Sequence, residues 1–124
     1  MTKTLGEVRE LPALAREVAI LVTAAHAKAA YAFYAHSAVS ALPKPDLDQI
    51  WQGECPAHLD SASQTAFHVA YDLCHQPGPL RQSVWEQAVE TLGRKAAVAL
   101  VHYVGFYKYV ATILNGFDAK VPDS

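Results

Sequence analysis

Four residues that can move protons lie within one stretch of this chain. The stretch from 17 to 36 is apolar and rich in alanine; Glu17 begins it, His36 ends it, and His26 and Tyr34 lie between them. A carboxylate beside an imidazole is a common acid/base pair, because histidine titrates near neutrality and the carboxylate can fix the tautomer of the ring. Glu17 and His36 are therefore a candidate pair. The alternative interpretation is a surface glutamate and a half-buried histidine.

The spacing of Glu17 and His36 sets a condition on the helices that carry them. Their separation of 19 residues spans about 28 Å in one straight helix, and the two side chains then point in different directions. They can meet only if the helix breaks between Ala25 and Lys28 and the second half folds back. The sequence therefore predicts two helices here with a break between them.

Length and composition bound the kind of protein this is. A chain of 124 residues with 52% hydrophobic and 18% charged residues predicts one domain, covering 1–124, that buries a core. The net charge of −2 provides no electrostatic footprint for nucleic acid or an anionic membrane. The residues before Pro12 contain no apolar signal core, so we expect a protein of the reducing cytoplasm. The shortage of charge predicts that some apolar surface is hidden against another subunit.

Helical periodicity and turn residues predict an all-α bundle of about five to six helices and no strand. The expected helical segments are 12–24, 27–42, 46–53, 61–75, 83–93 and 94–114. Prolines and a glycine mark the firmest break, at 76–79. Asp46, Ser61 and Ser83 are the expected N-caps of three helices, because each is followed three residues later by a glutamine or glutamate.

The last predicted helix is apolar enough to be compared with a membrane span. Residues 96–114 form a run of 19 mostly apolar residues, but His102 and Lys108 lie well inside it. A lysine near the centre of a membrane span costs about 2.5–3.5 kcal/mol on insertion. The prediction is a helix buried in the bundle or in a subunit interface, and no membrane span.

Two further groups of residues have the chemical types that bind metals. His68, Asp72 and His75 share one helix face, and Cys55 and His58 lie close together in a loop. The chain lacks the cysteine-rich spacing of a tetrahedral zinc site. A solvated helix face is therefore the preferred interpretation, and no metal site and no cofactor are predicted.

Three segments together resemble the carboxymuconolactone decarboxylase family, which includes the alkyl hydroperoxide reductase D-type proteins. The segments are AREVAILVTAAH, AYAFYAHSAVSA and ETLGRKAAVALVHYVGFYKYVATILNGFDAKVP, and the resemblance covers about residues 7 to 122. The redox branch carries Glu, eleven residues, Cys, two residues, Cys, three residues and His. On this chain the Glu falls on Glu17 and the His on His36, whereas the cysteine positions fall on Ala29 and Ala32.

The resemblance implies a helical bundle that assembles as a trimer or hexamer and acts as a cofactor-free enzyme. The implied substrate is a small carboxylated lactone or a related product of aromatic degradation. Loss of CO2 leaves an enolate-type anion, which needs a donor at the developing charge and a proton for carbon. His36 would be the donor or proton source, and Glu17 would orient it. Tyr34 and His26 would help to place the substrate, although an ordinary core aromatic is the preferred alternative for Tyr34.

Departures from the family pattern bear directly on function. Ala29 and Ala32 remove the thiolate pair, which excludes disulfide exchange here and argues against the alternative of hydroperoxide-linked antioxidant activity. Ala32 also replaces an acid that decarboxylase-like members often carry. A third hypothesis is therefore a non-catalytic protein that binds a small molecule or serves in assembly. Cys55 and Cys74 lie outside the motif and are interpreted as structural.

Overall fold

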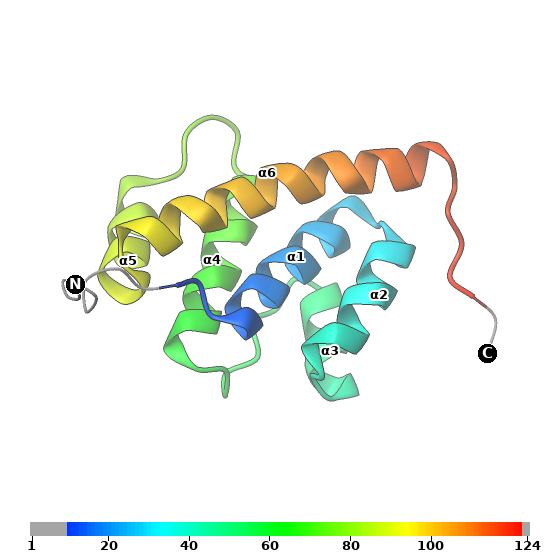
Figure 1. The fold of residues 1–124 in the computed structure, drawn as a ribbon, viewed down its shortest axis with the longest axis horizontal. Helices are drawn as coiled ribbons and strands as arrows, with labels where there is room; N and C mark the ends of the chain where they lie inside the picture. Colours follow the sequence, from blue (N-terminus) through cyan, green and yellow to red (C-terminus); the bar gives the residue numbers. More distant parts are fainter. Residues whose placement is uncertain (1–9, 123–124) are drawn as a thin grey trace.

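The computed structural model describes residues 10–122, and in that range it contains six helices and no strand. The helices are α1 (Ala13–Ala27), α2 (Ala30–Ser40), α3 (Lys44–Trp51), α4 (Ser61–His75), α5 (Gln82–Leu92) and α6 (Arg94–Gly116). Helix α6 runs along the length of the molecule, and α1 lies beneath it between α4 and α2 (Figure 1). The prediction of an all-α bundle is confirmed.

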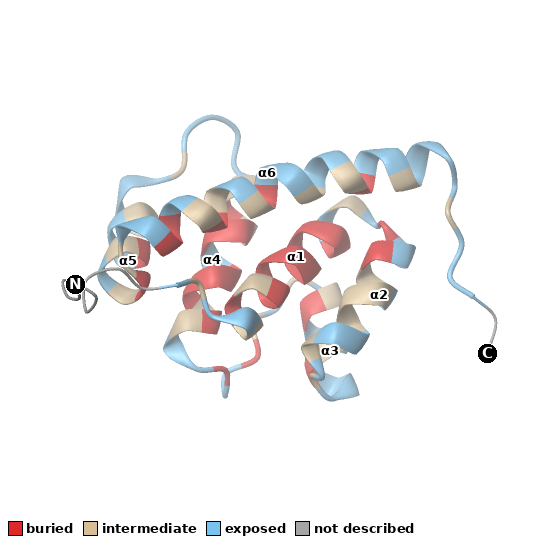
Figure 2. Cartoon of the chain, viewed as in Figure 1, coloured by how far each residue is buried: buried red, intermediate tan, exposed pale blue. Residues whose placement is uncertain are grey.

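Helix α1 is the centre of the fold because it is apolar on all sides. Every residue from 17 to 25 is buried, and α1 packs against α2, α3, α4 and α6 (Figure 2). A helix that is hydrophobic all round belongs in a core. Within this run Thr23 satisfies its hydroxyl by donating to the Ala19 carbonyl at 2.9 Å. Glu17 is the one charged residue of the run, so the fold places a carboxylate in its interior.

The chain breaks at Lys28, within the window predicted from the spacing of Glu17 and His36. Lys28 adopts a left-handed φ of 57°, and its amide donates to the Ala25 carbonyl at 3.2 Å. A left-handed residue at this position lets the last carbonyls of a helix find donors. Helix α6 secures the same end, because the side-chain amide of Asn115 donates to the Ala27 carbonyl at 2.8 Å. Helix α2 then folds back beside α1.

Small side chains allow α1, α2 and α6 to approach one another next to this break. Ala24, Ala29, Ala32 and Ala111 form a buried cluster, and the distance between packed helices depends on the side chains at the contact. Ala29 is 1% exposed and Ala32 is 4% exposed. The two positions that the family pattern gives to cysteines are therefore packing positions in this fold.

Two predicted N-caps, at the starts of α4 and α5, are wrong. Helix α4 is capped by Asp60 instead of Ser61, and the Asp60 carboxylate accepts from the Ser63 amide at 2.8 Å. A carboxylate accepts a backbone amide more strongly than a hydroxyl does, so the earlier residue takes the cap. Helix α5 begins after Arg81 with no side-chain cap, and Ser83 lies inside its first turn.

Asp46 does not cap α3 either, because the helix begins one turn earlier, at Lys44. A proline in the first turn is pre-organised for a helical start. Asp46 is instead buried, and its Oδ1 accepts from Nε2 of His58 at 2.8 Å. The contact ties α3 to the loop that precedes α4.

The contact between Asp46 and His58 predicts a pH-dependent stability. The hydrogen bond that His58 donates to Asp46, and then the negative charge of Asp46, raise the pKa of His58. Because the pKa of His58 is higher in the folded than in the unfolded protein, its contact with Asp46 stabilises the fold fully at pH values below the unfolded-state pKa of about 6.5. This stabilisation is lost as the pH rises through the folded-state pKa of His58. We expect His58→Gln to lower the urea-unfolding free energy at pH 5.5 and to have a smaller effect at pH 8.5. The exposed His68→Gln is the control, and an equal effect of His58→Gln at both pH values would contradict the prediction.

Helix α6 presents an apolar stripe to the outside of the molecule. We define the α6 stripe as the exposed residues Val98, His102, Phe106, Tyr109, Ile113 and Phe117, which follow at intervals of three or four and share one face. The opposite face packs on the body through Leu100, Val104 and Ala111. Lys108 is exposed but lies off this stripe, and its Nζ donates to the Leu73 carbonyl of α4 at 3.0 Å. The stripe therefore contains no residue with a permanent charge.

The exposure of α6 bears on the comparison with a membrane span. By length and composition alone α6 is able to cross a membrane, and 22% of its most apolar window is buried within the molecule. The sequence predicted a helix buried in the bundle or in a subunit interface, because His102 and Lys108 lie well inside the apolar run. Because the structure places Lys108 against the body, its charge does not oppose contact between the α6 stripe and another apolar surface.

Candidate functional site

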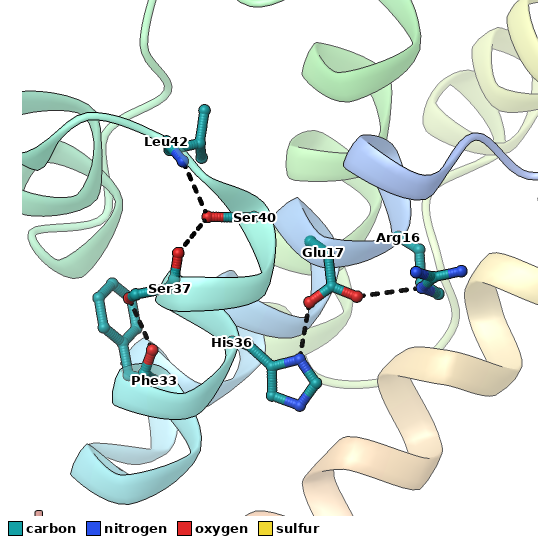
Figure 3. Close-up of polar contacts among 7 residues, drawn as sticks. All are labelled: Arg16, Glu17, Phe33, His36, Ser37, Ser40 and Leu42. Atoms are coloured by element: carbon teal, nitrogen blue, oxygen red, sulfur yellow. Dashed lines mark hydrogen bonds and ion pairs between the residues drawn. The ribbon is translucent and has the colours of Figure 1, made fainter.

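Glu17 and His36 meet where α2 folds back along α1. The His36 Nδ1 atom lies 2.7 Å from Oε1 of Glu17 (Figure 3). Glu17 is 4% exposed, whereas His36 is half-buried, with 21% of its side chain exposed. The contact that the helix break was predicted to allow is therefore formed, with a buried carboxylate behind an accessible imidazole.

Arg16 occupies the second oxygen of the same carboxylate. Its Nε donates to Oε2 of Glu17 at 3.1 Å (Figure 3). A buried carboxylate is costly unless it is paired and hydrogen-bonded, and here each oxygen has a donor. The Arg16 side chain is 34% exposed, so one end of the guanidinium holds Glu17 while the rest reaches toward solvent.

The hydrogen bond to Glu17 decides which nitrogen of His36 can react. An ionised carboxylate only accepts, so Nδ1 of His36 must carry a proton. In the neutral imidazole the other nitrogen, Nε2, then has a free lone pair. His36 is thus set to accept a proton at Nε2, or to donate one from Nε2 after protonation, while Nδ1 stays bound to Glu17.

Tyr107 of α6 adds a phenol that the sequence analysis did not single out. Its ring packs edge-on against the His36 ring, with 5.1 Å between the centroids and an interplanar angle of 84°. Burial, and then the negative charge of Glu17, raise the pKa of Tyr107. The phenol therefore remains a proton-bearing donor at neutral pH. The signal for it was weak, because α6 carries several aromatic residues and only packing selects one of them.

A cavity of about 240 Å³ lies beside the buried carboxylate, between the start of α1 and the end of α2. Arg16 and Glu17 line it from α1, and Val39 and Ser40 line it from α2. The Ser40 hydroxyl donates to the Ser37 carbonyl at 2.8 Å and accepts from the Leu42 amide at 3.2 Å, which holds the far wall (Figure 3). The cavity is the size of a small organic acid and has an arginine in its wall.

The structure does not bring His26 or Tyr34 to this pair. His26 lies nine residues along α1 from Glu17, a rise of about 13 Å, and its ring contacts His75 instead. Tyr34 is 49% exposed, so the core-aromatic alternative is wrong, and its ring lies near that of Tyr31. Both were singled out because they lie between Glu17 and His36 in sequence, but the helical rotation points them elsewhere.

The remaining candidate residues have structural surroundings. No group of three metal-ligating side chains occurs among residues 10–122, and Asp72 is a buried partner of Arg81 instead of part of a solvated face. Cys55 and Cys74 are free, and burial raises the pKa of both thiols. Neither thiol is therefore prepared to act as a thiolate.

Comparison of the chain with protein-family models, with curated protein sequences and with solved structures gave no match. The resemblance to the carboxymuconolactone decarboxylase family therefore stays a prediction from the sequence. What the site can do rests on its own geometry: a buried carboxylate paired with an arginine and with an imidazole that has one free nitrogen, a phenol against that imidazole, and a cavity lined by Arg16 and Glu17.

Proposed function

We propose that this protein is a cofactor-free acid/base enzyme that acts on a small carboxylated lactone or a related product of aromatic degradation. The observation that carries the proposal is the 2.7 Å contact between His36 Nδ1 and the buried Glu17, which leaves Nε2 of His36 free for proton transfer. Decarboxylation of the carboxymuconolactone type is the reaction that the sequence resemblance adds. The proposed location is the cytoplasm.

The proposed reaction divides its steps among three side chains. As the bond to the carboxylate breaks and CO2 leaves, its electron pair moves into an enolate that extends to the lactone carbonyl oxygen. Arg16, which lines the cavity, stabilises the negative charge on that oxygen. His36 in its protonated form donates its Nε2 proton to carbon and regains one from water. Glu17 holds Nδ1 of His36 throughout.

The test is CO2 release from a panel of small carboxylated lactones, with His36→Ala as the first variant. We expect turnover of at least one panel member by the wild-type protein and none by His36→Ala, with an unchanged helical circular dichroism spectrum. His68→Ala, which removes an exposed imidazole from α4, is the matched control. Activity of His36→Ala equal to that of the wild type would falsify the assignment.

The same assay separates the other two hypotheses. A thiol-dependent peroxide reduction has no support in the geometry, because Ala29 and Ala32 pack in an alanine cluster and burial raises the pKa of both thiols. A non-catalytic binding protein predicts that panel members raise the melting temperature while no CO2 is released. That outcome would support a protein that binds a small molecule and would contradict the proposal of an enzyme.

We also propose that the chain forms a homo-oligomer through the α6 stripe, with a second copy as its occupant. Two stripes that pair in antiparallel fashion around a two-fold axis near Phe106 and Tyr109 bring apolar residues together without any charge clash. Aromatic residues are enriched in such interface cores. Phe106 is 56% exposed and Tyr109 is 64% exposed in the single chain, which leaves both free for this contact. The resemblance adds the expectation of a trimer or hexamer.

Light scattering after size exclusion tests the assembly. We expect the wild-type protein at micromolar concentration to elute with a mass of at least two chains, and Phe106→Ser with Tyr109→Ser to shift it to one chain. Val121→Ser, which alters an exposed apolar residue away from α6, is the control. A monomeric wild-type protein that binds lipid vesicles through the stripe would contradict the proposal and identify a membrane surface as the occupant.

A further inference from the structure

A second cavity, of about 150 Å³, lies at the opposite end of α1 from Glu17, beside the break between α1 and α2. We call it the His26 cavity. His26 and Lys28 line it from the end of α1, Trp51 from the end of α3, and Tyr71 and His75 from α4. It shares none of these residues with the cavity beside Glu17. An inference about it therefore does not rest on the proposed function.

A chain of hydrogen bonds fixes the tautomers of the two histidines. Nδ1 of His75 lies 2.9 Å from the Tyr71 carbonyl, and a carbonyl only accepts, so this nitrogen carries the proton. In neutral His75, Nε2 is then the acceptor, and Nδ1 of His26 donates to it across 3.3 Å. The Tyr71 ring stacks on His75 at 3.9 Å between centroids and holds its plane. Nε2 of His26 is left with no protein partner among the described residues.

The surroundings of His26 are cationic. The Lys28 ammonium lies 4.9 Å from the centre of the Trp51 ring, and none of the residues that line the cavity is acidic. Three groups face His26: His75 from α4, Lys108 from α6, and Lys28 from the break itself. Burial first, and then these three groups, lower the pKa of His26. The cavity therefore holds a neutral imidazole, with a free lone pair, beside an ammonium group that lacks a counterion there.

The backbone at Lys28 supports a role for its side chain. Its φ of 57° is a left-handed conformation that glycine adopts without strain and other residues adopt at a cost. Glycine would thus suit the helix end better than lysine does. The Lys28 side chain extends over the ring of Trp51 and forms part of the cavity wall.

We propose that the His26 cavity binds a small planar carboxylate of about one ring. A cavity of this volume is comparable to one that holds benzene in an apolar core. The rings of Trp51 and Tyr71 contact the planar part, and the carboxylate pairs with Lys28 and His26. The negative charge of the bound carboxylate offsets the positive groups around His26 and raises the pKa of its ring. The ring therefore takes up a proton from solvent as the ligand binds. Binding is therefore tighter at lower pH.

Benzoate is the probe, titrated at constant ionic strength into the full-length protein while the ring signals of its six histidines are followed by NMR. We expect saturable shifts at His26 and His75 and none at His36. Calorimetry in buffers of different ionisation enthalpy should show proton uptake. The dissociation constant should rise between pH 6 and pH 8, by up to about tenfold per pH unit where uptake is complete.

Lys28→Gly separates binding from folding, because glycine suits this backbone. We expect it to keep the melting temperature of the wild-type protein and to weaken benzoate binding at least tenfold, and we expect Lys28→Gln to weaken binding to a similar degree. Lys120→Gln, which removes an exposed lysine from the C-terminal segment, should bind like the wild type. The proposal is overturned if benzyl alcohol binds as tightly as benzoate, if both Lys28 variants bind benzoate normally, or if benzoate shifts His36 in place of His26.

Discussion

Replacing Glu17 with glutamine is expected to lower kcat for the proposed reaction by about 10²–10⁴-fold. The carboxylate only accepts, so it requires a proton on Nδ1 of His36 and leaves Nε2 as the reactive nitrogen. The glutamine amide can instead donate to Nδ1. That arrangement leaves no proton on Nδ1, so His36 can then hold a proton at Nε2 only in the neutral ring, which is a much weaker acid than the protonated ring that the proposed reaction uses.

The effect of Glu17→Gln should be chemical more than structural. Glutamine has nearly the same shape and can still bond Arg16 and His36, so we expect a loss of stability of about 1–2 kcal/mol. Steady-state kinetics should show a fall in kcat with little change in KM, and the NMR signals of the His36 ring should report the altered tautomer. Glu90→Gln, an exposed change on α5, is the control. A kcat of Glu17→Gln within threefold of the wild-type value would contradict the role of Glu17 in the reaction.

Replacing Arg81 with glutamine is expected to destabilise the fold by about 3 kcal/mol. Nε and Nη2 of Arg81 lie 2.7 Å and 2.6 Å from Oδ1 of Asp72, and the Arg81 amide donates to Oδ2 at 3.1 Å. The pair joins α4 to the start of α5 across the loop at 76–80. Asp72 is 1% exposed in its side chain, whereas that of Arg81 is 63% exposed. Loss of the arginine thus leaves a buried carboxylate with one backbone donor.

Substitution of the partner, Asp72, should lower the free energy of unfolding less, because Asp72 is buried and Arg81 is exposed. In Asp72→Asn the guanidinium can turn to water, so the remaining charge is solvated and the expected loss is about 1–2 kcal/mol. Urea unfolding of both variants at pH 7 measures the difference, and Lys44→Gln, which breaks an exposed pair with Asp48, is the control for a surface ion pair. Equal losses for Arg81→Gln and Asp72→Asn would show that the desolvation of Asp72 does not govern this contact.

Much of the helix pattern follows from local chemistry and could be predicted. Gly93 ends α5, α6 begins at Arg94 as expected, and the chain breaks at Lys28. The end of α5 is set by the backbone preference of glycine, whereas the start of α6 and the break at Lys28 follow the apolar spacing, which acts within a few residues. The predicted caps failed at Asp46, Ser61 and Ser83, because a capping pattern reports only which side chains are able to cap.

The site was predicted in part, and the missing part comes from other helices. Glu17 and His36 were found because a carboxylate and an imidazole are a common acid/base pair and because the resemblance places both in the family pattern. Their contact depended on a helix break, which is a local property. Tyr107 was missed, since its contact with His36 depends on how α6 lies across α1 and α2. His26 was predicted to help place the substrate of His36 but contacts His75 instead, for the same reason: sequence proximity on one helix does not say which neighbouring helix a side chain faces.

The sequence by itself determined the helical class, the apolar character of α1 and the break that lets His36 return to Glu17, because these depend on residue type and on spacing along the chain. Only the tertiary structure decided that Tyr107 packs against His36, that His26 pairs with His75, and that the α6 stripe faces outward. Those outcomes depend on the packing angles and offsets between helices. Such angles and offsets follow from the shapes of all the packed side chains together and from no single motif.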